Sequence, residues 1–137
     1  MRVQHIDLSV KDFEKITNLL QRIRPSDIYK QKCLEKLRAE IERARIIPPQ
    51  DIAPNVVTLH TTVLLIDEQT GKELIYMLVL PEEADPQEGT ISVLSPIGIC
   101  MLGARIGDWF STDTAEGYRT LRLIKVLYQP EAAYIYE

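Results

Sequence analysis

The spacing of apolar residues along this chain changes at the stretch Val56-Val57-Thr58-Leu59-His60-Thr61-Thr62-Val63-Leu64-Leu65. From here apolar residues recur at every second position, which is the period of a half-buried β-strand. Before this stretch the apolar residues follow a helical period, and after it several further strand-like segments occur. The sequence therefore predicts an α+β protein in which a helical part precedes an antiparallel sheet.

The helical part contains two predicted helices. The apolar stripe of the first helix consists of Phe13, Ile16, Leu20 and Ile23, which are spaced 3, 4 and 3 residues apart. The second repeats these spacings with Leu34, Leu37, Ile41 and Ala44. Ser9 with Asp12 resembles a capping box at the first helix, Pro25 ends that helix, and Pro48-Pro49 ends the second. A connection of about four residues predicts an antiparallel hairpin, a short coiled coil.

The sheet part begins with the alternating stretch, in which Val57, Leu59, Val63 and Leu65 share one face. A loop at residues 67–72, with Gly71 at a position of positive φ, connects this strand to a central strand at 73–80. A polar loop over residues 82–89 and a short strand marked by Ile91 and Val93 follow.

The end of the chain is predicted to contain a short helix and two more strands. Ser95 and Pro96 are suited to the cap and the first position of the helix, and Gly103 to its end. A strand through Trp109 and Phe110 follows, and the last strand is expected at 118–128. Its core-facing residues are expected to be Leu121, Leu123 and Leu127.

Charge supports a division into a hairpin at residues 1–50 and a sheet domain at 51–137. Residues 1–55 carry 11 Lys and Arg against 8 Asp and Glu, whereas residues 56–137 carry 5 against 12. The net charge of the whole chain is −4, which argues against direct binding of nucleic acid through its phosphates. We expect contact with DNA or RNA only through a protein partner.

Composition excludes several other classes of protein. Hydrophobic residues make up 45% and charged residues 26% of the 137 residues, as is usual for a globular protein. None of the apolar runs approaches the roughly 18 residues of a membrane span, and the N-terminus does not resemble a secretion signal. Two cysteines far apart predict neither a disulfide framework nor a metal knuckle. We expect no membrane contact and a cytoplasmic protein.

Residues that often carry chemistry are scattered. His5 and His60 are isolated and expected to be structural or on the surface, and Cys33 and Cys100 are expected to be buried as small apolar residues. No nucleophile with a matching base and no glycine-rich phosphate loop is found, so we expect neither catalysis nor a cofactor. A less favoured alternative is a prolyl-isomerase pocket formed by four aromatic residues: Tyr76, Trp109, Phe110 and Tyr118.

Specific motifs lie between residues 80 and 108. They are Leu80-Pro81-Glu82-Glu83-Ala84-Asp85-Pro86-Gln87-Glu88-Gly89-Thr90-Ile91-Ser92-Val93, then Ser95-Pro96-Ile97-Gly98, Leu102-Gly103 and Ile106-Gly107-Asp108. These motifs resemble the C-terminal domain of the GreA/GreB transcript cleavage factors. The short hairpin and the ending Tyr128-Gln129-Pro130-Glu131-Ala132-Ala133 are most similar to the Rnk-like subgroup, named after a regulator of nucleoside diphosphate kinase. The resemblance implies an FKBP-like sheet domain.

The resemblance also implies a partner, bacterial RNA polymerase. The docking surface would consist of Leu94, Ser95, Pro96 and Ile97, although Ser95 and Pro96 equally suit a purely structural helix cap. Leu94 stands where cleavage factors have an acid. By the same resemblance, the chain would be a monomer that regulates transcription and competes with other factors of the polymerase's secondary channel.

Cleavage factors present paired acids at the tip of a long coiled coil, where these acids help to hold a catalytic Mg²⁺. The tip here contains Arg24 and a single acid, Asp27, which also suits a helix cap, so no metal site is expected. The resemblance therefore implies binding without stimulation of cleavage. The alternatives are a regulator of nucleoside diphosphate kinase and a cleavage-stimulating factor.

Overall fold

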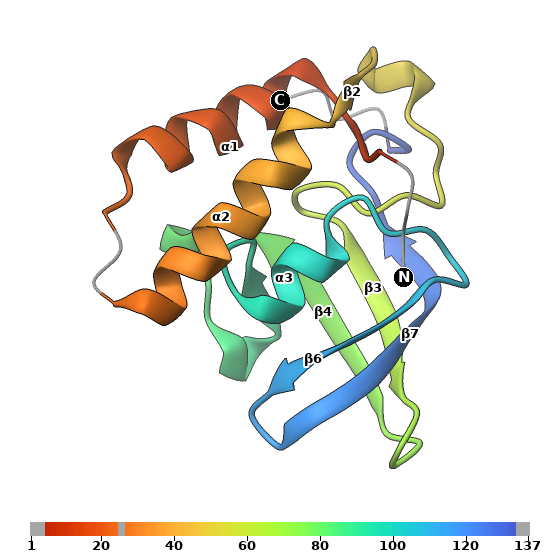
Figure 1. Ribbon diagram of the computed structural model, residues 1–137. Coiled ribbons are helices and arrows are strands. Elements are labelled where there is room, and N and C mark those ends of the chain that lie inside the picture. The colour runs from red at the N-terminus through yellow and green to blue at the C-terminus, as the bar shows by residue number, and fades with distance from the viewer. Residues whose placement is uncertain (1–4, 25–26, 134–137) are drawn as a thin grey trace.

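The chain was analysed as a computed structural model that describes residues 5–24 and 27–133. The first elements are β1 (Asp7–Leu8), α1 (Val10–Arg22), α2 (Ile28–Glu42) and β2 (Arg45–Ile46). They are followed by β3 (Thr62–Asp67), β4 (Glu73–Val79), β5 (Thr90–Ser92), α3 (Pro96–Met101), β6 (Trp109–Thr114) and β7 (Gly117–Tyr128). Figure 1 shows the three helices on one side of a curled sheet. The predicted α+β architecture, a helical hairpin followed by a sheet with one short helix, is confirmed.

Both hairpin helices begin where the sequence predicts. The Ser9 hydroxyl accepts a hydrogen bond from the Asp12 backbone N–H at 3.2 Å, and Asp27 caps α2 by accepting one from the Lys30 N–H at 2.8 Å. The predicted capping box is wrong in its second half, because the Asp12 carboxylate accepts from the Leu59 backbone N–H at 3.1 Å instead of turning back to Ser9. This bond joins α1 to the sheet part of the chain.

The second helix ends earlier than Pro48-Pro49 predicts, and Ala44 lies outside it. Arg45 and Ile46 form β2, which pairs in parallel with β1. Asp7 of β1 is buried and accepts hydrogen bonds from the guanidinium groups of Arg45 and Arg105 at 3.0–3.1 Å. Burial by itself would raise the pKa of Asp7, but the two arginines hold it below its ordinary value. After the end of α2, the chain is therefore held by its pairing with β1 and by a non-local ion cluster.

The five-stranded sheet has the order β5-β4-β3-β7-β6. Along the chain, the first strand of this sheet is β3, which begins at Thr62, so the prediction of a strand through residues 57–61 is wrong. These residues form a turn in which the Thr61 hydroxyl accepts from the Thr58 N–H at 2.9 Å and His60 has a φ of 67°. Val57 and Leu59 are buried nevertheless, because the turn leads them into the core.

The sheet is not wholly antiparallel, since β5 pairs in parallel with Met77–Val79 of β4. The loop between them contains short 3-10 helices at Pro81–Glu83 and Pro86–Glu88 and returns the chain to the level of Met77, from which β5 runs in the same direction as β4. The prediction of a turn at residues 67–72 is confirmed, with Gly71 at a φ of 75°.

The last strand contains two irregularities that the sequence does not reveal. Its register with β3 shifts between Leu64 and Leu65 and again between Thr62 and Val63. Such bulges reverse the alternation of side chains along a strand. Leu121 and Leu123 are buried as predicted, but the prediction for Leu127 is wrong, because its side chain is 49% exposed while Val126 packs against the core.

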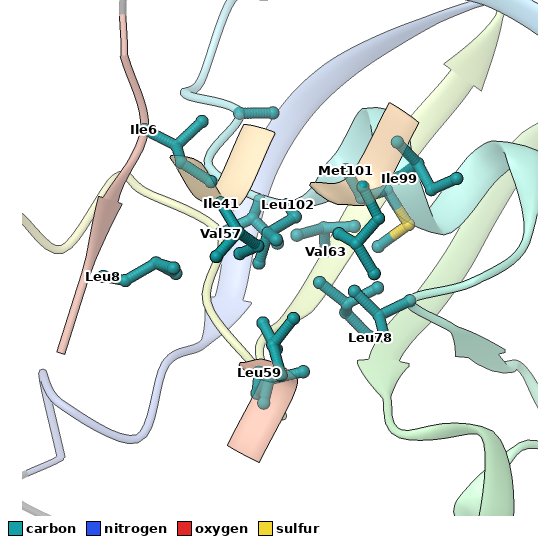
Figure 2. Close-up of a cluster of buried hydrophobic side chains, with 14 of the residues drawn as sticks. Ile6, Leu8, Ile41, Val57, Leu59, Val63, Leu78, Ile99, Met101 and Leu102 are labelled. Atoms are coloured by element: carbon teal, nitrogen blue, oxygen red, sulfur yellow. The ribbon is translucent and has the colours of Figure 1, made fainter. Parts of the chain in front are cut away.

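The hydrophobic core is continuous from the hairpin to the sheet. Figure 2 shows Ile6, Leu8 and Ile41 beside Val57, Leu102 and Val63. Buried residues of α1 and α2 belong to the same cluster as those of the sheet and α3. The boundary near residue 50 stays a prediction. Among the described helices, none is both long and apolar enough to cross a membrane.

Candidate docking site

The predicted docking residues, Leu94 to Ile97, form a corner where the chain turns from β5 into α3; we call these four residues the corner. The Ser95 hydroxyl accepts from the Gly98 backbone N–H at 3.0 Å and donates to the Ser92 carbonyl at 2.8 Å. Pro96 is the first helical residue, as predicted. Several local bonds therefore hold the corner in one conformation.

Close packing beneath the corner depends on Gly98. A Cβ atom at this position would lie 1.9 Å from the carbonyl oxygen of Ser92. Glycine thus allows the first turn of α3 to lie directly on the end of β5. Because no larger residue fits without moving the backbone, the position of the corner is coupled to that of the sheet.

The corner is half-buried rather than fully exposed. The side chains of Leu94 and Ile97 pack against the core. Ser95, Pro96 and Ile97 line an open groove of about 600 Å³. The apolar part of its lining includes Leu74, Tyr76, Ile91 and Leu121. The corner is therefore a well-ordered and mainly apolar surface beside this groove.

Tyr29 of α2 lines the same groove, and the sequence analysis did not single it out. It is 52% exposed and also lines, with Pro96, a smaller pocket of about 230 Å³ between α2, α3 and β6. The start of the second hairpin helix thus lies beside the corner. The signal that could have identified Tyr29 from the sequence is an aromatic residue at the start of a predicted helix.

The hairpin tip shows two local roles for its predicted residues. The Arg24 guanidinium donates to the carbonyls of Gln21 and Ile23 at 3.0 and 3.1 Å, and the Asp27 carboxylate caps α2. Pro25 and Ser26 lie outside the described residues. Within the described ranges there is no group of three or more His, Cys, Asp or Glu residues that could hold a metal ion.

The acidic loop after β4 contacts α1 and the turn at residues 58–61. Glu82 lies 3.3 Å from the Arg22 guanidinium of α1, although both side chains are more than half exposed. Glu83 lies 2.9 Å from the Nε2 atom of His60. Burial would raise the pKa of Glu83, but the hydrogen bonds with His60 and the Leu80 N–H lower it overall. His60 therefore lies in a turn and contacts an acid, rather than being isolated on a strand.

A pair of buried acids lies where α1 meets the turn at residues 58–61. Asp12 accepts from the Leu59 N–H, and Glu131 accepts from the Thr58 hydroxyl at 2.8 Å. Burial raises the pKa of Asp12 to about 6, and the nearby Glu131 carboxylate adds to this shift. The sequence analysis interpreted Asp12 only as a local cap, because its partners are distant in sequence.

The expectation that both cysteines are buried is not met. Cys33 and Cys100 are half-buried, not buried, and both line the pocket between α2, α3 and β6. The four aromatic residues of the isomerase alternative do not line one pocket: Tyr76 lines the larger groove and Tyr118 the smaller one, and neither lining includes Trp109 or Phe110.

Taken together, these features define a factor with a helical hairpin packed on a curled sheet and an ordered corner at the start of α3. Residues 49–128, more than half of the chain, match the family described as transcription elongation factor, GreA/GreB, C-term. The chain therefore belongs to the GreA/GreB family, and the resemblance found in the sequence is confirmed.

The similar proteins carry two different descriptions. The transcription elongation factor GreA of Beijerinckia indica is 33% identical over 96 residues, which cover 70% of this chain and 61% of the relative. The regulator of nucleoside diphosphate kinase of Escherichia coli is 32% identical over 100 residues, which cover 72% of this chain and 74% of the relative. The chain thus spans less than two-thirds of the length of the GreA protein.

Solved structures agree with the fold. The prokaryotic transcription elongation factor GreA/GreB from Nitrosomonas europaea has a TM-score of 0.77 at 30% identity, covering 90% of this chain and 98% of its own. The GreA factor homolog 1 of Thermus thermophilus, at 23% identity and a TM-score of 0.52, shares the fold.

Proposed function

We propose that this chain binds bacterial RNA polymerase and regulates transcription elongation, docking through the corner formed by Leu94, Ser95, Pro96 and Ile97. Family membership over residues 49–128 carries the proposal, because the matched segment contains the whole corner and the sheet that supports it. One copy binds one polymerase, in the cytoplasm. It competes there with other factors that use the secondary channel.

The corner has properties that suit docking. Its backbone is fixed by the hydrogen bonds of Ser92 and Ser95, so a partner would not have to order a flexible loop. Leu94 presents an apolar side chain where the cleavage factors have an acid, which favours an apolar contact at this point of the polymerase surface.

The proposed factor does not stimulate transcript cleavage. The supporting observation is that Asp27, the acid of the hairpin tip, uses its carboxylate to cap α2 at 2.8 Å from the Lys30 nitrogen. A helix-capping carboxylate that is the sole acid between residues 23 and 28 does not supply the paired oxygen ligands that the cleavage mechanism needs. The chain itself then acts as a binding protein rather than an enzyme.

A second candidate is a regulator of nucleoside diphosphate kinase. It is favoured by the coverage of the Escherichia coli regulator, of which the alignment spans 74%. Co-purification separates the two functions: tagged chain should retain core polymerase and not the kinase. Retention of the kinase without polymerase would favour the second candidate.

The main test is the affinity for core RNA polymerase of a variant with Pro96→Arg. Ser95 remains as the cap and arginine is compatible with a helix, so the fold should lose about 1 kcal/mol or less. An arginine forced into an apolar contact must lose its water, so binding should weaken at least tenfold. Pro49→Arg is the matched control, because Pro49 also begins a short helical turn and is half-buried, but lies in another part of the chain.

Thermal melting of both variants distinguishes a loss of the docking contact from a loss of the folded structure. Weak binding by Pro96→Arg together with normal melting supports the corner as the docking surface. Unchanged binding would place the interface elsewhere. A transcript-cleavage assay on a backtracked complex completes the test, and stimulation by the wild-type chain would contradict the interpretation of the tip.

A further inference from the structure

The sheet has an outer face that points away from the helices. Residues paired across neighbouring antiparallel strands share a face, so the register defines three rows of this outer face. The first row consists of Met77, Thr62 and Tyr128. The second row consists of Ile75, Leu64 and Lys125. The third row consists of Glu73, Ile66, Arg122 and Trp109.

None of these ten residues is buried. Ile75 is 59% exposed, Trp109 47% and Tyr128 43%. In Figure 1 the labelled helices all lie on the opposite side of the sheet. A sheet face open to water normally carries polar side chains, whereas six of these ten are aliphatic or aromatic and only three are charged. Apolar patches of this kind mark interaction surfaces.

The charges of the outer face are separated by strand. Glu73 lies on β4, whereas Lys125 and Arg122 lie on β7, and Arg122 also pairs with Glu68 of the turn after β3 at 2.6 Å. Between them, the outward-facing residues of β3 are uncharged. Because the strands are about 4.8 Å apart, Glu73 and Arg122 stand about 10 Å apart within one chain, with Ile66 between them. An acidic strand and a basic strand thus flank an apolar one.

The third row of this arrangement is complementary to itself in charge. A second copy, rotated about a two-fold axis parallel to β3, places its β7 over β4 and its β4 over β7. The rows stay in register under this rotation, so Glu73 comes opposite Arg122 of the second copy and Ile66 opposite its own equivalent. Face-to-face packing at about 10 Å between aligned sheets is common in β-sandwiches.

We propose that a second copy of this chain covers the outer face and forms a two-fold dimer through β3, β4 and β7. The dimer is weak, because three rows of side chains on three strands offer a small area compared with a stable interface. This dimer is a different interaction from polymerase docking and does not depend on that docking. The corner lies at the start of α3, on the side of the sheet that carries the helices. The monomer expected from the sequence then describes the protein at low concentration and on polymerase.

The test measures self-association by sedimentation velocity of the full chain over a wide range of concentration. We expect the wild type to shift from monomer to dimer as concentration rises. Glu73→Arg or Arg122→Glu alone should weaken dimerisation at least about tenfold, because each places like charges opposite one another. The variant that carries both substitutions should recover, since the pairs are restored with reversed polarity.

An apolar variant tests the centre of the face independently of charge. Ile75→Lys should also weaken dimerisation about tenfold or more, whereas Ile28→Lys, at an exposed isoleucine of α2 away from the sheet, should not. Melting curves verify that each variant is folded.

Three results would overturn the proposal. The first is a wild type that stays monomeric at every concentration, and the second is a double variant that fails to recover. The third is a loss of polymerase binding by Glu73→Arg without any self-association of the wild type, which would make polymerase the occupant of the outer face. The sedimentation experiment contains no polymerase, so its failure leaves the docking proposal standing.

Discussion

The helical hairpin and the five-stranded sheet differ in how they are held. Each strand of the sheet is hydrogen-bonded to at least one neighbour, with β3 and β7 paired along most of the length of β3. The buried side chains of α1 and α2 instead share their cluster with residues of the sheet and of α3. The hairpin is therefore a pair of helices packed on the sheet rather than an independent arm. The stability of the hairpin should depend on the sheet.

Polar contacts connect the two regions as well. Asp12 binds the backbone of Leu59, and Asp7 binds Arg105, which lies 98 residues further along the chain. The hairpin helices therefore lie against the sheet part of the chain through apolar and polar contacts alike. The following predictions test how strongly the two regions are coupled.

The largest effect is expected from Leu37→Asp. Leu37 is fully buried in α2, and a charged, shorter side chain there loses apolar contacts and must be desolvated. We expect a loss of about 4 kcal/mol or more in the free energy of unfolding. Because the core is continuous, thermal melting followed by circular dichroism should show helix and sheet lost in one transition at a lower temperature. A sheet that melts as in the wild type would make the two regions separate folding units.

A smaller loss is expected from Gly103→Ala, at the contact between the N-terminal strand and the end of α3. Its φ of +78° disfavours alanine, and the added Cβ would lie 2.3 Å from the Cγ2 atom of Ile6. We expect a loss of about 3 kcal/mol in chemical denaturation.

The matched control is Gly107→Ala. Gly107 has a φ of +96° but no atom within 4 Å of its added Cβ, so only the backbone cost of about 1 kcal/mol should remain. Equal effects of the two substitutions would show that the contact with Ile6 contributes little.

The third prediction concerns pH and the junction between α1 and the turn at 58–61. Because the pKa of Asp12 is raised to about 6 in the folded state, the folded chain binds more protons than the unfolded chain between about pH 4 and 6. The contribution of Asp12 to stability is therefore fully present below pH 4 and is lost as the pH rises through 6, by about 2–3 kcal/mol.

Asp12→Asn keeps an oxygen for the Leu59 N–H but has no charge. Relative to the wild type, this variant should be more stable at pH 7.5 by about 2 kcal/mol, and the advantage should disappear at pH 4.5. Urea denaturation at the two pH values measures the difference. Effects of acids that do not interact with Asp12, such as Asp7, cancel because both proteins contain them. A pH-independent difference would mean that Asp12 is ionised normally in the folded chain.

The smallest effect is expected at the hairpin tip. Asp27→Ala removes the cap of α2 and should cost about 1 kcal/mol, whereas Asp27→Asn should cost less because asparagine also caps helices. Polymerase affinity should be nearly unchanged in both variants. A loss of any Mg²⁺-dependent cleavage activity in Asp27→Asn, which removes the charge and keeps the cap, would overturn the structural interpretation of this residue.

Local signals in the sequence were reliable where neighbouring residues decide the conformation. Ser9, Asp27 and Ser95 cap the helices that their positions predict, and Gly71 has the positive φ expected of its turn. Capping and turn formation require partners only two to four residues away. The corner at residues 94–97 could therefore be placed at a helix start from the sequence, although its role in docking is a proposal.

Predictions failed where a distant partner decides. The end of α2 is decided by Arg45 and Ile46, which pair with β1 as β2 instead of continuing the helix. Likewise the sequence gives Leu127 the same alternation as Leu121 and Leu123. No residue type near Leu127 signals that a bulge against β3 reverses its direction.

The sequence by itself determined the order of the three helices and of the strands β3 to β7, most caps and turns, and membership of the GreA/GreB family, because all of these depend on residue types at short or fixed spacings. Only the tertiary structure decided the parallel pairing of β5, the two bulges of β7, the burial of Asp12 against Leu59 and the apolar outer face with its separated charges. These features depend on which strands and helices meet across dozens of residues. Hydrogen bonding and burial between such distant segments are satisfied only once the whole chain has folded.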